Sequence, residues 1–255
     1  MDVLTCVKRV PDTGARIVLT DDRQEIDASN LGYTMSPHEE CAIEEAIQQV
    51  EDHGGSSTAL TLGPPDAEEQ VRTAIAMGAD HGMLLETDES EWGPSETAAA
   101  IADAIEAREA DEGEFDLLIF GNESADAENY QVGIRVANRL GRPVVAGVKG
   151  LDLDDSTATA EREVSGGSEI YELPMPAVIT VKEGINEPRY PSMRAKMQAR
   201  KQELDERTAE RTVEDGLQMI ELEAPEQDES PAEVLGEGPE AAPAVVDVLE
   251  ELEVL

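Results

Sequence analysis

Short, continuous apolar runs alternate along the first 140 residues with longer segments in which apolar residues recur at helical spacing. The apolar runs predict buried strands at Val3–Val7, Thr58–Leu62, Met83–Leu85 and Phe115–Gly121. The periodic segments predict helices that begin near Ser36, Asp66, Thr97 and Gln131. Repeated strand–helix units of this length favour an α/β fold with a mostly parallel, doubly wound sheet and helices on both faces.

The pattern changes after Gly141 to a β-rich second half. Strands are predicted there at Val144–Val148, Thr157–Val164, Ser168–Leu173, Ala177–Val181 and Leu217–Leu222. Residues 224–243 are rich in Glu, Pro, Ala and Gly, which predicts an extended linker. Helical apolar spacing returns in residues 244–255 and predicts a short helix with one docking face. We therefore expect an α/β domain over residues 1–200 and a C-terminal extension over residues 201–255.

Two loops at predicted strand ends are candidates for ligand binding, because ligands of such sheets bind beyond the carboxyl ends of the strands. One follows Leu62, and the other runs from Gly121 to Gly133 and leads into a helix near Gln131. A helix start offers unpaired backbone N–H groups to a phosphate. Neither a Walker loop nor a G-x-G-x-x-G motif is present.

The chain is strongly acidic: it has 58 Asp and Glu residues and 19 Lys and Arg residues, which gives a net charge of −39. A disordered acidic chain lacks apolar periodicity, which this chain has. We favour a folded protein whose carboxylate-coated surface suits near-molar salt, where the Debye length falls to about 3 Å. So negative a chain disfavours binding to nucleic acid, because the phosphates would be repelled.

The N-terminus lacks the basic start and long apolar run of a signal peptide. No segment reaches the roughly 20 apolar residues of a membrane span. Cys6 and Cys41 form no metal-ligand spacing with the three histidines. We expect a cytoplasmic protein with no direct membrane insertion and no metal site.

A local reversal of charge follows the predicted strand Ala177–Val181. Six basic residues lie between residues 182 and 201: Lys182, Arg189, Arg194, Lys196, Arg200 and Lys201. Either this segment recognises a partner, or its helix balances nearby acidic residues.

Five segments occur in an informative order: Val7–Val10, Met35–Pro37, Ala42–Ala46, Arg72–Asp80 and, as the most specific, the N-E-P-R-Y motif of Asn186–Tyr190. Together they resemble the beta subunit of the electron transfer flavoproteins, in a halophile-type acidic form. The resemblance covers almost the whole chain, although residues 224–243 match poorly.

The resemblance implies a heterodimer in which an alpha subunit mainly holds a shared FAD and this subunit holds AMP. Electrons would arrive from flavin-dependent dehydrogenases and leave to a membrane quinone oxidoreductase. The C-terminal extension would contact the alpha subunit, and the isolated chain would catalyse nothing.

The resemblance also assigns cofactor-binding positions. They are Cys6, Ser36, Pro37, His38, Glu39, Leu62, Asp126, Ala127, Glu128, Asn129, Tyr130, Gln131, Val132, Gly133 and Ile134. Ser36 and His38 depart from the Asn-Pro-Phe that is frequent in the family. Simpler roles stay open: Cys6 as a packing residue, His38 as a surface histidine and Asp126 as a helix cap. Gly133 would permit close approach of the backbone to the nucleotide.

The choice of nucleotide depends on the loop before Gln131. Electron-bifurcating members, which bind a second FAD in place of AMP, usually read D-G-D-T-A-Q-V-G there. This chain keeps Gln131-Val132-Gly133 but lacks the Gly-Asp-Thr. We favour AMP, and a bifurcating component with a second FAD and NAD(H) stays open as an alternative. A nucleotide-binding regulatory module of similar architecture is a further alternative, but it leaves the N-E-P-R-Y motif unexplained.

By the same resemblance, residues 183–201 form a recognition loop for dehydrogenases. Its recognition residues would be Asn186, Glu187, Pro188, Arg189, Tyr190, Met193, Arg194 and Lys196. Met193 would enter an apolar pocket of the partner, a role that suits an unbranched and polarizable side chain; the alternative is internal packing. Arg189, Arg194 and Lys196 would steer acidic partners, whereas Arg200 and Lys201 would pair with this subunit's own acids.

The acidic composition yields the first testable prediction. Dialysis into dilute buffer should cause loss of structure or of partner binding, because self-repulsion is no longer screened. Circular dichroism and the assembly state measure both effects. An unchanged spectrum and unchanged assembly at low salt would contradict the prediction.

Overall fold

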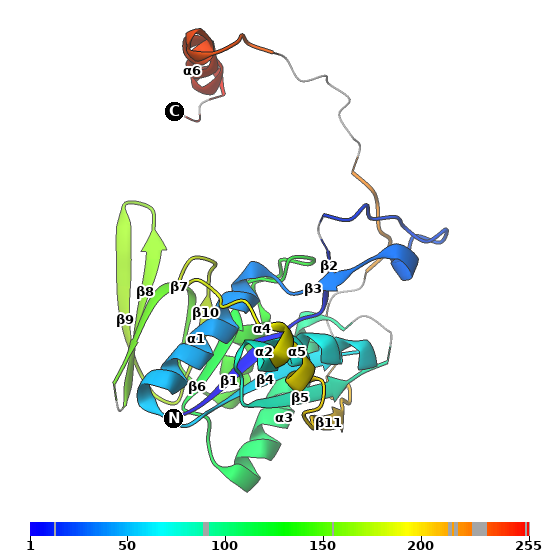
Figure 1. Cartoon of the computed structure of the whole chain (residues 1–255), viewed down its shortest axis with the longest axis vertical. Helices are drawn as coiled ribbons and strands as arrows, with labels where there is room; N and C mark the ends of the chain where they lie inside the picture. Colours follow the sequence, from blue (N-terminus) through cyan, green and yellow to red (C-terminus); the bar gives the residue numbers. More distant parts are fainter. Residues whose placement is uncertain are drawn as a thin grey trace.

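A computed structural model describes residues 1–12, 14–88, 92–154, 156–213, 216, 219–225, 234–252 and 254. Within them, strands from both halves of the chain form one nine-stranded sheet in the order β11-β5-β4-β1-β6-β10-β7-β8-β9 (Figure 1). The strands are β1 (Asp2–Val7), β4 (Ser56–Gly63), β5 (His81–Glu86), β6 (Leu117–Gly121), β7 (Val144–Leu153), β8 (Thr157–Val164), β9 (Gly167–Pro174), β10 (Ala177–Val181) and β11 (Asp205–Thr208).

The sheet is parallel from β11 through to β7 and antiparallel in the β7–β8–β9 ribbon. A separate antiparallel pair joins β2 (Val10–Pro11) to β3 (Tyr33–Thr34). The predicted fold class is thus confirmed: a mostly parallel sheet with a β-rich second half.

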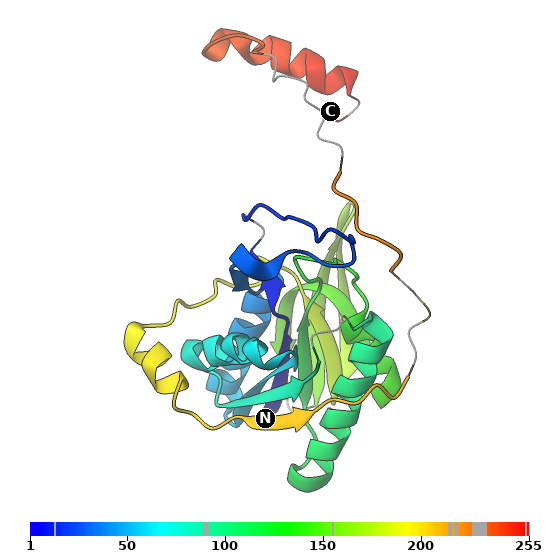
Figure 2. The ribbon, with the colours of Figure 1, turned by 90° about the vertical axis from the view of Figure 1, so that its right-hand side faces the viewer.

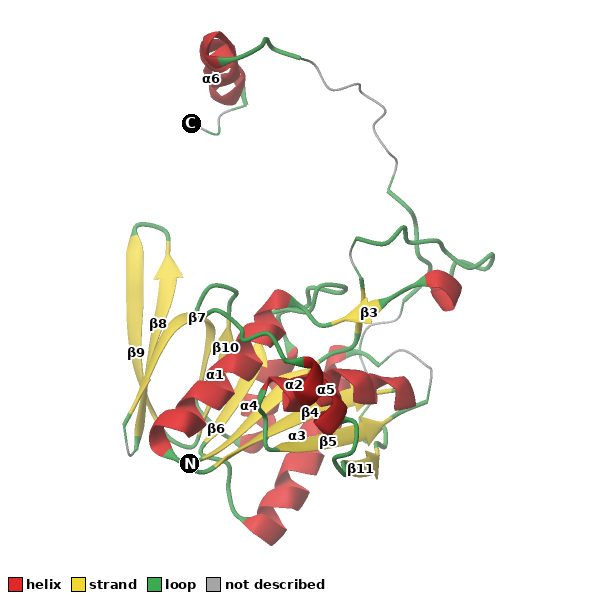
Figure 3. Ribbon diagram, viewed as in Figure 1, coloured by secondary structure: helices red, strands yellow, loops and turns green. Residues whose placement is uncertain are grey.

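Helices cover both faces of the sheet, as Figures 2 and 3 show. The helices are α1 (Pro37–His53), α2 (Glu68–Met77), α3 (Pro94–Glu112), α4 (Val132–Leu140), α5 (Met193–Ala199) and α6 (Ala242–Glu251). Successive side chains of β1 point to opposite faces. Leu4 packs with Ile101 and Val136 of the α3–α4 layer, whereas Val3 packs with Ala42 of α1 on the other face.

The start of α1 follows the sequence closely. Ser36 accepts a hydrogen bond from the Glu39 N–H, and the Glu39 carboxylate accepts one from the Ser36 N–H at 2.8 Å, which completes the predicted capping box. Pro37 occupies the first helical turn, where its missing N–H costs nothing. This cap fixes the point at which α1 begins, beside the carboxyl ends of β1 and β6.

The structure corrects three details of the sequence interpretation. Residues 205–208 were not expected to form a strand, yet β11 pairs in parallel with β5 at one edge of the sheet. Of the strand expected at Leu217–Leu222, residues 217 and 218 lie outside the described residues, and residues 219–222 form no strand. The terminal helix begins at Ala242, within the segment expected to be linker.

Helix α6 lies apart from the α/β body in two perpendicular views (Figures 1 and 2). None of its residues is buried, and Val245 and Val246 are exposed. Among the described residues, no helix combines the length and apolarity that crossing a membrane requires.

Candidate functional site

The first part of the candidate site lies where the chain reverses its direction of winding across the sheet. From β1 the chain adds β4 and β5 on one side, and it then returns to place β6 on the other side of β1. The loops that leave β1 and β6 at their carboxyl ends therefore diverge at a topological switch point. Open α/β sheets bind their ligands at such points.

An ion pair joins these two loops. The Lys8 ammonium, directly after β1, lies 2.6 Å from a carboxylate oxygen of Asp126 in the loop after β6. Burial alone would raise the pKa of Asp126, but the positive charge of Lys8 and its hydrogen bond outweigh this, so the pKa lies below its ordinary value. Asp126 thus holds a cation at the strand ends rather than capping α4, which begins six residues later.

The Ser36–Glu39 turn borders the same place. The Ser36 hydroxyl donates to the backbone oxygen of Glu123 at 3.1 Å, and the Glu39 carboxylate accepts from the Lys8 N–H at 2.7 Å. Burial raises the pKa of Glu39 to about 7, against the hydrogen bonds from Ser36 and Lys8 that favour its charged form. A side chain at Gly121 would meet Cγ of Glu39 at 2.8 Å, so the glycine that ends β6 makes room for this turn.

Cys6 and Leu62 lie on the strands that approach the switch point. Cys6 is 7% exposed, and burial followed by the nearby Glu39 carboxylate raises the pKa of its thiol well above the ordinary value. A thiol in this state is a packing group. Leu62 is partly buried and packs against the α3–α4 layer. Any contact of either residue with a ligand would involve the backbone.

Helix α4 begins with open hydrogen-bond donors. Gln131 precedes the helix with no side-chain cap, and within the described residues no acceptor meets the N–H groups of Val132, Gly133 or Ile134. The preceding residues Ala127–Tyr130 are exposed, and Glu128 and Tyr130 have positive φ angles of 47° and 56°. Such backbone conformations in non-glycine residues are concentrated at functional sites.

Gly133 has a packing role that the sequence did not reveal. A Cβ atom there would lie 2.8 Å from the Thr180 methyl group and 3.1 Å from Cγ of Phe120. The glycine therefore allows α4 to pack closely on β6 and β10. Its presence is explained without a ligand.

His38 is not a solvated surface residue. Its side chain is 17% exposed, and its Nε2 atom lies 2.9 Å from a Glu123 carboxylate oxygen. Its Nδ1 atom accepts the backbone N–H of Glu183 at 3.0 Å. Both ring nitrogens are thus occupied by groups of the protein itself.

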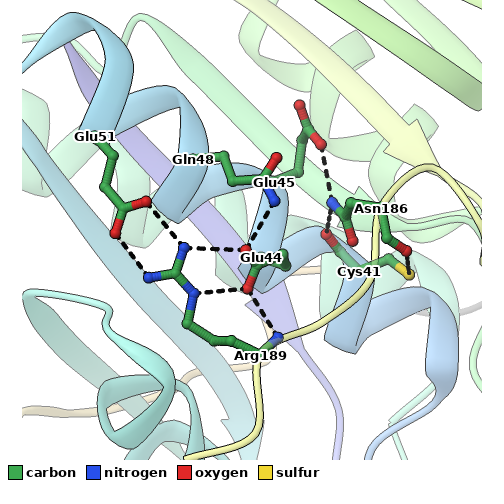
Figure 4. A network of polar contacts seen from close by, with 7 residues as sticks. All are labelled: Cys41, Glu44, Glu45, Gln48, Glu51, Asn186 and Arg189. Carbon is green, nitrogen blue, oxygen red and sulfur yellow. Dashed lines mark hydrogen bonds and ion pairs between the residues drawn. The ribbon is translucent and has the colours of Figure 1, made fainter.

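The second part of the candidate site is the segment after β10, which α1 holds at several points (Figure 4). Arg189 is the main anchor. Its guanidinium makes paired hydrogen bonds to the carboxylates of Glu44, at 2.9 and 3.0 Å, and Glu51, at 2.7 and 3.0 Å. Paired contacts of this kind are the strongest that Arg makes with carboxylates.

Electrostatics supports this anchoring. Burial alone would raise the pKa of Glu44, yet the hydrogen bonds from Arg189 bring the pKa below its ordinary value. The hydrogen bonds to Glu51 and Glu44 raise the pKa of Arg189. Asn186 adds further contacts, because its amide donates to the Cys41 backbone oxygen at 3.1 Å and to Glu45 at 2.9 Å.

The guanidinium of Arg189 is bound to Glu44 and Glu51, and its expected role in steering partners stays a prediction. The exposed residues of the segment are different ones. Tyr190 and Met193 are 89% and 75% exposed, which excludes internal packing of Met193 within this chain. Arg194 is exposed, and the Lys196 ammonium lies 4.8 Å from the centre of the Tyr190 ring. Glu187 and Pro188 are exposed as well.

Sequence reasoning missed Lys8, Glu44 and Glu51 as site residues. Lys8 had a usable signal, because it is a cation placed directly after a buried strand. The pairing of Arg189 with α1 had none, since it joins residues 145 positions apart. In the described part of the chain, no group of three His, Cys, Asp or Glu residues is arranged to hold a metal ion.

Comparison with known proteins gives one consistent family. Residues 25–212 match the model of the electron transfer flavoprotein domain. The electron transfer flavoprotein subunit beta of Bacillus subtilis (strain 168) is 34% identical over 255 residues, covering 98% of this chain and 97% of that protein. The proteins of the same name from Syntrophomonas wolfei and Dictyostelium discoideum are 36% and 31% identical, over 79% and 88% of this chain and 77% and 89% of their own.

The Arg189 anchor leads to the second prediction. Arg189→Met should lower the free energy of unfolding by about 1–3 kcal/mol, because it leaves the nearly buried Glu44 carboxylate without its partner. It should also increase amide hydrogen exchange in residues 186–192. Arg194→Met is the matched control, because it removes an exposed guanidinium from the same basic segment. Equal behaviour of the two variants would contradict the anchoring role.

Proposed function

Because this chain belongs to the electron transfer flavoprotein family as a beta subunit, we propose that it forms the adenylate-holding, partner-docking half of a heterodimeric electron carrier. The supporting observation is that one helix, α1, organises two separate places: the strand ends around Lys8 and the anchored segment around Arg189. Its companion is an electron transfer flavoprotein alpha subunit.

The strand ends suit a phosphate. The N–H groups of Val132, Gly133 and Ile134 have no acceptor within the described residues, and the start of a nine-residue helix favours an anion. Lys8 supplies a cation, for which a bound phosphate would compete with Asp126. These donors fit the phosphate of AMP. The loop Asp126–Tyr130 and the turn Ser36–Glu39 would enclose the rest of the nucleotide, with His38 supporting the turn.

The flavin would be shared with the alpha subunit, which would hold most of it. FAD supplies the electron-carrying ring system of the heterodimer. This chain's own contribution is to position the partner and to fix the adenylate, and we expect no catalysis from it alone. The heterodimer would work in the cytoplasm, without insertion of this chain into the membrane. Electrons would arrive from flavin-dependent dehydrogenases and leave to a membrane quinone oxidoreductase.

The segment 183–201 would be the docking loop for dehydrogenases. Asn186 and Arg189 hold its base on α1, so the exposed Tyr190, Met193 and Arg194 project from a fixed support. Met193 is suited to an apolar pocket of a partner because it is flexible and polarizable. Pre-organisation of the loop reduces the entropy lost on docking.

The C-terminal extension would contact the alpha subunit. Helix α6 places apolar Val245, Val248 and Leu249 on its surface without a partner in the described α/β body. A helix of ten residues is marginal in water without tertiary packing. Docking on a second chain would supply that packing.

The third prediction concerns the bound nucleotide. Acid extraction of the purified heterodimer should release one AMP and one FAD, which chromatography with absorbance detection quantifies. Lys8→Met should reduce the AMP content, because the cation at the strand ends is lost, whereas Lys201→Met is a control in the docking loop. Recovery of two FAD and no AMP would instead identify an electron-bifurcating component.

The fourth prediction concerns docking. Met193→Ala should lower kcat/KM for reduction by a dehydrogenase about 10- to 30-fold, the effect of losing a buried anchor side chain worth about 1.5–2 kcal/mol. Heterodimer formation and flavin content should not change. Met219→Ala removes another exposed methionine outside the docking loop and serves as the control. Unaltered reduction kinetics of Met193→Ala would remove the anchor role.

The fifth prediction concerns assembly. Deletion of residues 242–255 should weaken the heterodimer, and Leu249→Ser should raise its Kd about 10-fold by removing one apolar contact. Glu250→Gln, at an exposed neighbouring position, is the matched control. Analytical ultracentrifugation or titration calorimetry measures the Kd. Full affinity in the deletion variant would show that α6 does not contact the alpha subunit.

A further inference from the structure

The side chain of His38 contacts both the loop after β6, here called the adenylate loop, and the docking loop after β10. It stands in the first turn of α1, and its two ring nitrogens face in different directions. Nε2 reaches Glu123, at the beginning of the loop after β6. Nδ1 reaches Glu183, at the beginning of the loop after β10. The proposed function gives these loops different tasks, and neither task explains why one imidazole should join them.

The contacts fix the protonation pattern of the ring. The backbone N–H of Glu183 has no lone pair, so Nδ1 must accept from it at 3.0 Å. The Glu123 carboxylate accepts, so Nε2 carries the proton at 2.9 Å. The Glu183 N–H thus donates to Nδ1 of the imidazole, and Nε2–H of the same ring donates to the Glu123 carboxylate. Both side chains are less than one-fifth exposed, which limits competition from water.

Neighbouring contacts hold both ends of this chain in place. The Ser36 hydroxyl bonds the Glu123 backbone oxygen at 3.1 Å, and the N–H of Asn122 bonds the Val181 oxygen at 2.9 Å. The Thr180 hydroxyl also donates to the Asn122 side chain at 2.8 Å. Hydrogen bonds therefore join the beginnings of the two loops, which follow the adjacent strands β6 and β10. His38 contacts both loops from α1.

The docking loop is anchored along one face of the same helix. His38 holds Glu183, Glu45 holds Asn186, and Glu44 holds Arg189. Of these anchors, His38 alone among the described residues also bonds the adenylate loop. A change in the position of Glu123 therefore acts first on Glu183, the residue from which the docking loop departs.

We propose that His38 couples the two loops, so that an adenylate bound at the loop after β6 stabilises the docking loop after β10. Ordering of the adenylate loop fixes Glu123, Glu123 orients the imidazole, and the imidazole retains the Glu183 N–H. The coupling is a free energy shared by two sites, so a docked partner must also tighten adenylate binding by the same factor. The proposal rests on the proposed function, because it assumes that an adenylate binds at the strand ends.

Two substitutions separate the contact of His38 with Glu183 from its contact with Glu123. The side-chain oxygen of Asn can replace Nδ1, so His38→Asn keeps an acceptor for Glu183 but loses Glu123. The side-chain NH₂ of Gln can replace Nε2–H, so His38→Gln keeps a donor for Glu123 but loses Glu183. His38→Phe removes both. His53→Phe, at the far end of α1, is the control, since the only bond described for His53 is to Gln49 of its own helix.

The experiment is hydrogen exchange with mass spectrometry on the full heterodimer, stripped of nucleotide and then measured without AMP and with saturating AMP. In the wild type and in His53→Phe, AMP should slow exchange in a peptide that covers residues 182–189 by about fivefold or more, the lower range of measured couplings. In all three His38 variants this AMP dependence should disappear. Without AMP, His38→Asn should retain more protection at Glu183 than His38→Gln or His38→Phe.

Two results overturn the proposal in distinguishable ways. If AMP binds but slows exchange of this peptide equally in the wild type and in His38→Phe, or in neither, the coupling is wrong and the adenylate site stands. If the stripped wild-type heterodimer takes up no AMP, the adenylate site itself is wrong and the coupling falls with it.

Discussion

The paired hydrogen bonds between Arg189 and two carboxylates of α1 fix the segment after β10 to the rest of the molecule. A segment of exposed residues with few apolar contacts would ordinarily be mobile. Here a guanidinium bound to Glu44 and Glu51 fixes the base of the segment on a helix that is itself packed against the sheet. The exposed Tyr190 and Met193 therefore project from a rigid support, which is the condition for docking without a large entropic cost.

The same helix contacts both of the proposed functional regions. Its N-terminal cap borders the strand ends, where Glu39 bonds the Lys8 N–H, and its later turns carry Glu44, Glu45 and Glu51. Acidic residues on α1 thus serve as anchors for a basic segment in a chain of net charge −39. Contacts this short and partly buried are screened less by salt than exposed charges are.

Much of this arrangement was predictable from the sequence, and the remainder was not, for identifiable reasons. The strand–helix alternation and the Ser36 cap are local patterns, and both predictions are confirmed. Strand β11 was missed because the edge strand Asp205–Thr208 is polar and has no apolar alternation to reveal it. Interactions across the chain, such as Arg189 with Glu44 or His38 with Glu183, leave no trace in local spacing. Gly133 was assigned to ligand approach, although packing of α4 on Thr180 already requires it.

The central claim is that α1 holds an adenylate site at the strand ends and a docking loop after β10 in one rigid unit. A crystal structure of the heterodimer with its nucleotide tests this most directly. The account predicts an adenylate phosphate within hydrogen-bonding distance of the Val132–Ile134 N–H groups and the Lys8 ammonium, with Arg189 still bound to Glu44 and Glu51. A nucleotide located away from these strand ends, or a docking loop released from α1, would contradict it.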